Sequence, residues 1–343
     1  MNARLSTALL VTTSLLAACQ STQQAAVERS RSAPQHAPAP ISAMPDHQDT
    51  FASPNDALQA LTAAAKKQDM AALRQIFGPR IDQVASTDDV EKKAALQRFS
   101  DHLTQKAHMD LQNGGTAADL FIGENDYPFP IPLAKDAAGQ WFFDTAAGET
   151  ELLKRRIGND ELNTIDAMRA FADAQREYAS IDRDGNGIVE YADRFLSTPG
   201  HHDGLYWPAS VFEGQSPLGP LAAQAAAEGY PVATSSSDAT GRHPFHGYYF
   251  KILTRQGPAA PGGAYNYKIN GHMVAGFAFL AYPSEYGKSG IMTFIINRNN
   301  VLYQQDLGTN TEARAKAITT FNPDGHWTPV KDAAPDSGSA TRP

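Results

Sequence analysis

The sequence has only one cysteine, Cys19, among its 343 residues. Because a disulfide needs two cysteines, no intrachain disulfide framework can form. Basic residues are in the minority as well: 29 Lys and Arg stand against 37 Asp and Glu, which gives a formal net charge of -8. No basic cluster is long enough to follow a phosphate backbone, so the composition argues against nucleic acid as a partner.

Motifs that mark familiar catalytic sites are missing too. No serine stands in a Gly-x-Ser-x-Gly elbow, and no helical His-x-x-x-His pair is present. The glycine-rich segment 257–263 contains two prolines, which have no N–H to donate, and it is not closed by Gly-Lys-Ser/Thr. It is therefore expected to be a rigid connection and not a phosphate-binding loop.

The start of the chain, residues 1–18, has the layout of a secretory signal: basic Arg4, an apolar run and small residues before Cys19. The run is too short to cross a bilayer as a helix. Leu16-Ala17-Ala18-Cys19 resembles a bacterial lipobox, in which Cys19 is lipidated and begins the mature chain. The alternative is a plain signal peptide followed by a stray cysteine. Gln20 is not the aspartate of inner-membrane retention signals, so we expect a lipid anchor on the periplasmic face of the outer membrane of a Gram-negative bacterium.

Composition divides the remaining chain. Residues 19–50 and 331–343 are polar and lack an apolar period, which predicts a disordered tether and a disordered tail. Residues 51–150 predict an N-terminal α+β domain, a helical hairpin with a small sheet, whose opening resembles nuclear-transport-factor-like domains. Residues 151–330 predict a second domain, in which a long helix packs on a five-stranded antiparallel sheet.

Capping residues predict where the helices begin. Ser53 with Pro54, then Asp69, then the segment 86–89 precede three apolar-periodic stretches. A later helical pattern, Glu149 to Ser180, is expected in two pieces that break near Gly158-Asn159.

Five strand-like segments follow one another between His246 and Gly308, separated by turn residues such as Asn270-Gly271. They read HGYYFKILT, YNYKIN, HMVAGFAFLAYP, GIMTFIIN and VLYQQDLG. The small side chains of one strand face predict a close approach by the helix Glu161 to Ser180; these residues are Val274, Gly276, Ala278 and Leu280.

An aspartate-rich stretch after this helix has the spacing of a calcium-binding loop. The expected ligands at positions 1, 3, 5, 7, 9 and 12 are Asp182, Asp184, Asn186, Ile188 through its carbonyl, Glu190 and Asp193. Position 12 is an aspartate where a bidentate glutamate is usual, and only one loop is present. The alternative is a turn that joins two helices and caps the second.

Aromatic residues are concentrated after residue 205. Most should be core, but Tyr206, Trp207 and Tyr286 are candidates for a protein-partner surface, because tyrosine and tryptophan are favoured at interfaces. The histidines His201, His202, His243 and His246 offer no defined metal geometry, and we expect no metal or catalytic role for them.

Two resemblances follow from longer stretches of sequence. The segments GQWFFDTAAGETELLKRRIGNDEL, DGLYWP, GYYFKILTRQGPAAPGGAY and GFAFLAYPSEYGKSGIMTF resemble a family of secreted bacterial proteins known as domain of unknown function 2950. That resemblance implies no activity. More loosely, Ala174-Gln175 with Tyr178, followed by Gly247 to Phe250 and Ala281 to Pro283, resembles a pilin or pseudopilin head. The polymerising N-terminal helix of a pilin is missing.

The sequence therefore predicts a non-enzymatic, lipid-anchored envelope protein that presents a pilin-like domain to an unknown protein partner, with calcium as a candidate stabilising ion. One alternative is an envelope hydrolase acting on cell-wall or polysaccharide material, with Asp203 and Glu285 as acid and base. The other is a calcium-stiffened spacer. A convergent pair of carboxylates in a cleft would favour the hydrolase, and an aromatic-lined cavity would favour binding.

Overall fold

The computed structural model describes residues 47–86, 88–210, 214–231 and 244–331. The predicted signal peptide, Cys19, most of the tether and nearly all of the tail lie outside these residues. The fold starts before residue 50, because the Gln48 side chain is buried and donates hydrogen bonds to the carbonyl oxygens of Ile76 (2.9 Å) and Phe143 (2.8 Å). Among the described helices, none combines the length and apolar character needed to cross a membrane.

Four helices form the first layer, and three of them begin at the predicted caps, whereas the short third helix was not predicted and has no side-chain cap. The Ser53 hydroxyl accepts from the Asp56 amide, and the Asp69 carboxylate accepts from the Ala72 amide. Asp88 caps the fourth helix in the same way. The helices are α2 (Pro54–Lys66), α3 (Met70–Phe77), α4 (Ile81–Val84) and α5 (Asp89–Gln105).

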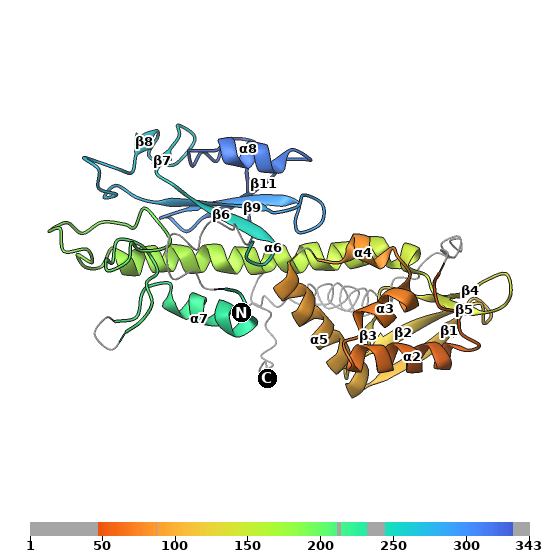
Figure 1. Cartoon of the computed structure of the whole chain (residues 1–343). Helices are drawn as coiled ribbons and strands as arrows, with labels where there is room; N and C mark the ends of the chain where they lie inside the picture. Colours follow the sequence, from red (N-terminus) through yellow and green to blue (C-terminus); the bar gives the residue numbers. More distant parts are fainter. Residues whose placement is uncertain (1–46, 87, 211–213, 232–243, 332–343) are drawn as a thin grey trace, which may run out of the picture. The chain divides into compact units, whose positions relative to one another are not determined.

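These helices pack on a small antiparallel sheet (Figure 1). Its strands are β1 (Ala107–Gln112), β2 (Ala117–Ile122), β3 (Tyr127–Pro128), β4 (Leu133–Lys135) and β5 (Trp141–Phe143). The order is β1-β2-β4-β5, with β3 paired to β2. The shared core contains Leu61, Phe77, Leu120 and Phe143. A small sheet covered by helices is the predicted N-terminal α+β architecture, although the predicted hairpin is a four-helix layer.

The long helix α6 (Thr145–Tyr178) is continuous, and the predicted break at Gly158-Asn159 is absent. A glycine inside a helix costs only about 1 kcal/mol relative to alanine. Burial of Met168, Phe171 and Tyr178 on one face outweighs that cost. Leu162, whose spacing to Ile165 and Met168 in the sequence predicts a place on the same buried face, is 64% exposed.

A second five-stranded antiparallel sheet lies against α6, as predicted, but one of its strands differs. The order is β12-β11-β10-β9-β6, where β6 is Tyr248–Leu253, β9 Ala278–Pro283, β10 Met292–Asn297, β11 Leu302–Asp306 and β12 Thr328–Pro329. The segment YNYKIN is not in this sheet: among the described strands, β8 (Tyr265–Asn266) pairs with β7 (Arg255–Gln256) alone. The Asn270-Gly271 turn is confirmed, with φ values of 52° and 92°.

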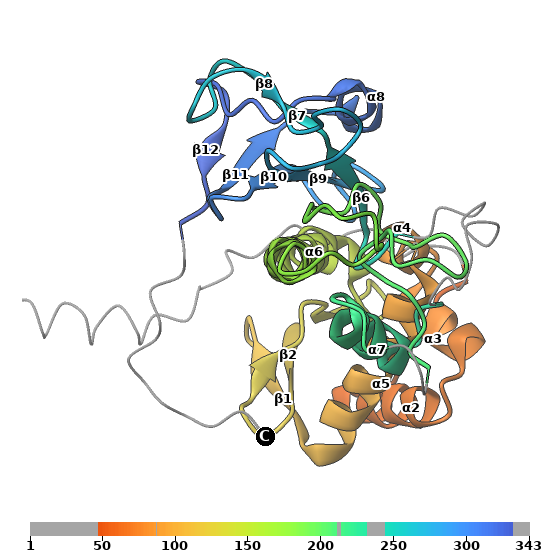
Figure 2. The same ribbon diagram turned by 90° about the vertical axis from the view of Figure 1, so that its left-hand side faces the viewer.

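The prediction of which sheet face lies under α6 was wrong by one residue. Phe171 of α6 contacts Phe279 of β9 (ring centroids 5.6 Å apart) and Phe250 of β6 (5.0 Å), so the Phe279 face meets the helix. Lys251, which is paired with Leu280 across the strands, reaches instead toward the end of α8 (Thr311–Ala317), where its Nζ donates to the Ile318 carbonyl (2.7 Å). Successive strand residues face opposite sides, and large aromatic rings fill the helix-facing side. Figure 2 shows α6 and α8 on opposite sides of this sheet.

Candidate functional site

The aspartate-rich loop follows α6 and folds back on its own backbone. The Asp182 carboxylate accepts from the amides of Gly185 (2.9 Å) and Gly187 (2.8 Å). Both glycines have positive φ, 73° and 86°, which the tight reversal requires. These backbone hydrogen bonds, that from Gly187 first, lower the pKa of Asp182. The Asn186 side-chain amide donates to both Asp184 and Glu190, so it bridges two carboxylates (2.8 Å each).

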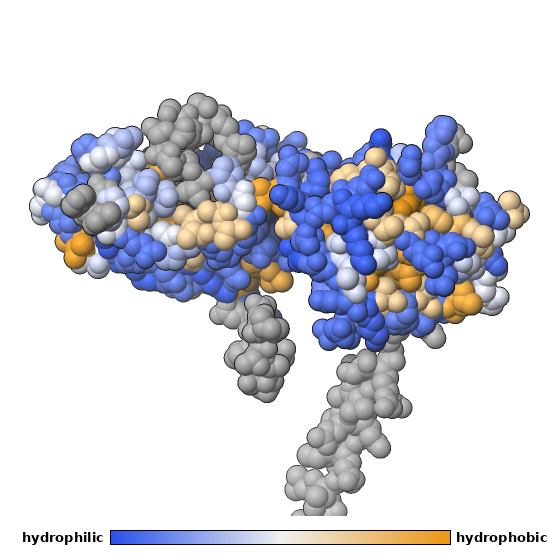
Figure 3. Space-filling model, turned by 60° about the horizontal axis from the view of Figure 1, so that its bottom comes forward, coloured by the Kyte–Doolittle hydropathy of each residue, from blue (hydrophilic) through white to orange (hydrophobic). Residues whose placement is uncertain are grey.

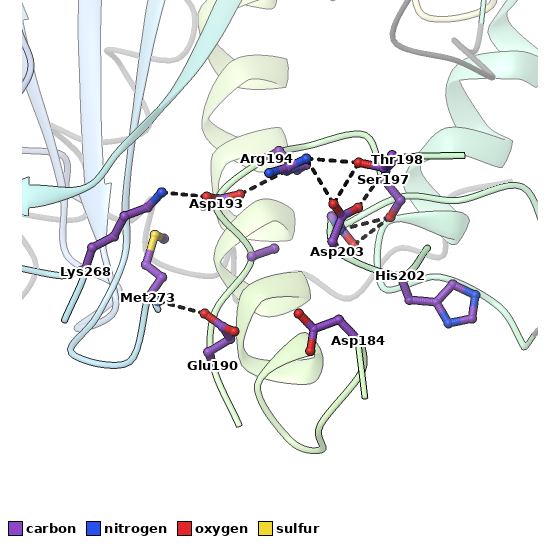
Figure 4. Close-up of polar contacts among 12 residues, drawn as sticks. Asp184, Glu190, Asp193, Arg194, Ser197, Thr198, His202, Asp203, Lys268 and Met273 are labelled. Carbon is purple, nitrogen blue, oxygen red and sulfur yellow. Dashed lines mark hydrogen bonds and ion pairs between the residues drawn. The ribbon is translucent and has the colours of Figure 1, made fainter. Parts of the chain in front are cut away.

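The far end of the loop, Glu190 and Asp193, is also tied to the rest of the domain (Figure 4). Glu190 contacts the His272 ring and accepts from the Met273 amide (2.8 Å each). Asp193 forms ion pairs with Lys268 (2.6 Å) and Arg194 (3.0 Å). Burial alone would raise the pKa of both carboxyls, but these hydrogen bonds and charges outweigh it, so both pKa values are lowered.

The loop fits a calcium ion only in part. The Asp193 carboxylate already forms ion pairs with Lys268 and Arg194. Within the described segment 88–210, no helix follows Asp193, so no helix holds this twelfth loop position toward the loop centre. For the same reason, the alternative of a turn that caps a second helix does not apply. In the part of the chain that the structure describes, no group of three or more acidic, histidine or cysteine side chains is arranged as a metal site.

The three predicted partner-surface residues lie in different settings. Trp207 is buried, stacks on His202 at 4.3 Å and donates through its indole N–H to the Gly214 carbonyl (3.0 Å), so it is part of the core. Tyr286 lies in the turn after β9, and its hydroxyl donates to Asp306 (3.2 Å). Tyr206 lines a cavity beside α7 (Gly219–Glu228). The structure does not bring the three together.

The cavity lined by Tyr206 adjoins a second cavity, and both are lined by Phe250 of β6. A cavity of about 370 Å³ is lined by Phe171, Phe195, Tyr248, Tyr249, Phe250, Lys251 and Tyr282. A second, of about 220 Å³, contains Tyr206, Tyr230 and Phe245 and shares Phe171 and Phe250 with the first. We call the two together the aromatic groove. The sequence signal was the density of aromatic residues, but it did not show which of them remain accessible.

Strand β6 is the edge of its sheet, and part of its backbone is unpaired. Ser284 N donates to Gly247 O, so Gly247 is a residue whose backbone groups point toward β9. Because alternate residues of an antiparallel strand pair with the neighbouring strand, the backbone N–H and C=O groups of Tyr248, Phe250, Ile252 and Thr254 point away from β9. Two of these four residues are paired within the domain: Tyr248 N donates to Phe245 O and Tyr248 O accepts from Phe245 N, while Thr254 O accepts from Tyr267 N. Among the described residues, the outward groups of Phe250 and Ile252 have no backbone partner. We call these groups the free edge of β6.

A second unusual feature, which the sequence reasoning missed, is a buried carboxyl on α6. Asp160 is fully buried, and neither of its oxygens has a hydrogen-bond partner among the described residues. It packs beside Gly247, where an added Cβ would lie only 3.0 Å from Asp160 Oδ2. Glu91 and Asp88 are nearby acids; Glu91 accepts from Ser86 Oγ (2.7 Å), and Asp88 accepts from the Tyr230 hydroxyl (2.8 Å).

Burial and, next, the like charge of Glu91 raise the pKa of Asp160 to about 9, and Arg156 offsets only part of this shift. Asp160 is therefore protonated at neutral pH. Burial also lowers the pKa of His246, which contacts Glu228 at 3.2 Å and donates its backbone N–H to Tyr230. A signal for Asp160 was present in the sequence: it lies four residues before Thr164 and eight before Met168, on the buried face of the helix.

The acid and base suggested for a hydrolase are far apart. Asp203 accepts from Thr198 N (2.7 Å) and pairs with Arg194 near the end of α6, where the Tyr178 hydroxyl donates to His202 O. Glu285 pairs with Lys288, whose carbonyl accepts from Arg156. Residues 156 and 178 are separated by roughly 33 Å along a helix that rises 1.5 Å per residue. Asp203 and Glu285 therefore do not form a catalytic pair.

The fold defines an α+β protein with a long helix between antiparallel sheets. Residues 48–330 match the family described as "Protein of unknown function (DUF2950)", and the chain belongs to this family. Neither a curated protein nor a solved structure matches the chain. The likeness to a pilin head thus gains no support from known structures.

Proposed function

We propose that this chain is a non-enzymatic envelope protein that binds an extended segment of a protein partner along β6. The observation that carries the proposal is the coincidence of the aromatic groove with the free edge of β6. An extended peptide can add to an exposed sheet edge through main-chain hydrogen bonds, while side-chain pockets beside the edge give specificity.

The dimensions of the site limit the length of the bound segment. Phe250 and Ile252 offer two N–H and two C=O groups, and the neighbouring outward residues are already paired within the domain. The segment would therefore pair over about three to four residues, since alternate residues of a strand point toward its neighbour. Phe250 lines both cavities of the groove, so the segment's apolar side chains would enter on either side of it.

The lipid anchor at Cys19 and the periplasmic face of the outer membrane belong to the same proposal, and they rest on the lipobox and on Gln20. An anchored chain would be joined to the membrane by the tether predicted for residues 19–50 and would present β6 to the periplasm. No nucleic-acid partner is proposed. The hydrolase alternative is not proposed, because Asp203 and Glu285 lie too far apart to act as its acid and base. Asp160 does not replace them, because it lines none of the three cavities described for the chain.

Photocrosslinking in cells tests this proposal. A photoreactive phenylalanine analogue in place of Tyr206 or Tyr249, both in the aromatic groove, is expected to capture one defined envelope protein. The matched control is Ile269, which is 51% exposed and outside the groove. Equal capture from position 269, or links formed only within the chain itself, would contradict the proposal.

Calcium is proposed as a structural ion in the aspartate-rich loop, held by Asp182, Asp184, Asn186, the Ile188 carbonyl and Glu190. Asp193 would remain with Lys268. Extracellular calcium sites have Kd values of about 0.1–1 mM, so 10 mM CaCl₂ should stabilise the fold by about 1.4–2.7 kcal/mol. Thermal melts should show a higher Tm with CaCl₂ than with MgCl₂, and Asp184→Ala should remove the difference. An unchanged Tm with calcium would show that the loop is only a turn.

A further inference from the structure

The largest of the three cavities described for the chain, about 580 Å³, lies among α5, the first half of α6 and the turn after β2. This volume lies in the range that takes a ligand of drug size. Its apolar part includes Phe99 and Phe129, which stack at 5.0 Å, together with Ile122 and Leu152. The space-filling view shows apolar side chains between charged ones on the body that carries α2 to α5 (Figure 3, right).

The charge of this cavity is opposite to that of the chain. Its lining carries four basic residues, Lys92, Arg98, Arg155 and Arg156, against two acidic ones, Glu91 and Glu124. The lining therefore has an excess of two positive charges in a chain whose net charge is -8. An anionic ligand would be attracted to this cavity in preference to the surrounding surface.

The four basic residues are not equally available. Arg155 donates to Glu151 and to the Pro128 carbonyl (2.7 Å each), and Arg156 donates to the carbonyl oxygens of Lys288 and Val84. Lys92 pairs with Asp89 at 2.9 Å. Arg98 is exposed, and within the described part of the chain its guanidinium has no hydrogen-bond or ion-pair partner. A guanidinium matches the two oxygens of a carboxylate in a bidentate arrangement.

We infer that this cavity binds an amphipathic carboxylate, whose apolar body lies against Phe99, Phe129 and Leu152 and whose carboxylate pairs with Arg98. The inference does not depend on the partner site at β6, because the two sites share no lining residue. The chemistry is that of a medium-chain fatty acid or a similar aliphatic acid, because the lining supplies one apolar wall and one available guanidinium.

Calorimetric titration with decanoate and with decanol tests the inference. The chain from Gln20 onward keeps every described residue and avoids the signal segment. We expect saturable binding of decanoate to this chain and weaker binding of decanol. Arg98→Ala should weaken decanoate binding about tenfold or more, the loss of one charge-assisted pair, and leave decanol binding unchanged.

The matched control is Lys93→Ala, which removes a positive charge from an exposed position on the same helix outside the cavity. It should bind decanoate like the parent chain. An absence of saturable decanoate binding at millimolar concentration would overturn the inference. So would an equal loss in the Arg98 and Lys93 variants, because that result would show only a general effect of charge.

Discussion

Replacement of Asp160 by asparagine is expected to stabilise the folded chain at pH 8 by several kcal/mol, at most about 6 kcal/mol, because the folded chain no longer has to hold a proton that the unfolded chain has released. The side chain keeps its shape, but it loses the ionisable group whose charge would be buried beside Glu91. Most substitutions of buried residues destabilise a protein, so an increase in stability would be distinctive.

The raised pKa of Asp160 should make the stability of the folded chain depend on pH. The pKa of Asp160 is about 9 in the folded chain and near its ordinary value of 3.8 in the unfolded chain. Between these two values the folded chain retains a proton that the unfolded chain has released. Stability should therefore fall as pH rises through this window, by up to about 1.4 kcal/mol per pH unit, and Asp160→Asn should remove that contribution.

Denaturant unfolding at pH 5, 7 and 8.5 measures both effects. The matched control is Asp166→Asn, six residues later on α6, where the carboxylate side chain is 81% exposed. The control should change neither stability nor its pH dependence by more than about 0.5 kcal/mol. Destabilisation of Asp160→Asn at all three pH values would contradict the prediction, because it would show that the carboxyl group makes a favourable contact that asparagine cannot replace.

Replacement of Ile252 by proline is expected to abolish partner capture from the aromatic groove while the sheet remains folded. The Ile252 N–H points outward at the free edge, so its loss removes no bond of the β6–β9 ladder. It does remove one of the two donors that an added strand would use. Capture by a photoreactive group at position 249 should fall at least about tenfold, since a lost hydrogen bond together with the proline ring blocks the pairing.

The control for this change is Ile252→Ala, which loses the same side chain but keeps the N–H. It should retain most of the capture and should have a Tm close to that of the proline variant. Capture by the proline variant at the level of the alanine variant would mean that the partner contacts only side chains. A proline variant that unfolds at growth temperature would instead show that Ile252 N–H belongs to the native ladder.

The fold was predictable where local chemistry determines it. Ser53, Asp69 and Asp88 cap helices because their side chains accept from backbone amides, and Asn270-Gly271 turns because both residues tolerate positive φ. Long-range choices were not predictable in the same way. The fifth strand of the second sheet comes from Thr328–Pro329 and not from the segment after Tyr265, because pairing partners far apart in sequence leave no local signal.

The candidate sites show the same division. The aspartate-rich turn was visible in the spacing of its residues, but the ion pair between Asp193 and Lys268 joins residues 75 positions apart. The spacing of Asp160 to Thr164 and Met168 places it on the buried face of α6, but an aspartate on a helix is usually solvated, and the sequence does not show its packing against Gly247. The free edge of β6 depends on the complete ladder, including the bond from Ser284 to Gly247.

Amide hydrogen exchange at β6 is the most direct test of the central claim, that a partner segment adds to this edge. In the free chain, the outward amides of Phe250 and Ile252 should exchange much faster than the ladder amides of Tyr249 and Lys251. When the captured partner is bound, we expect strong protection of Phe250 and Ile252 and little change at the ladder amides. If the partner binds with its full affinity and Phe250 and Ile252 still exchange rapidly, the partner does not pair with β6.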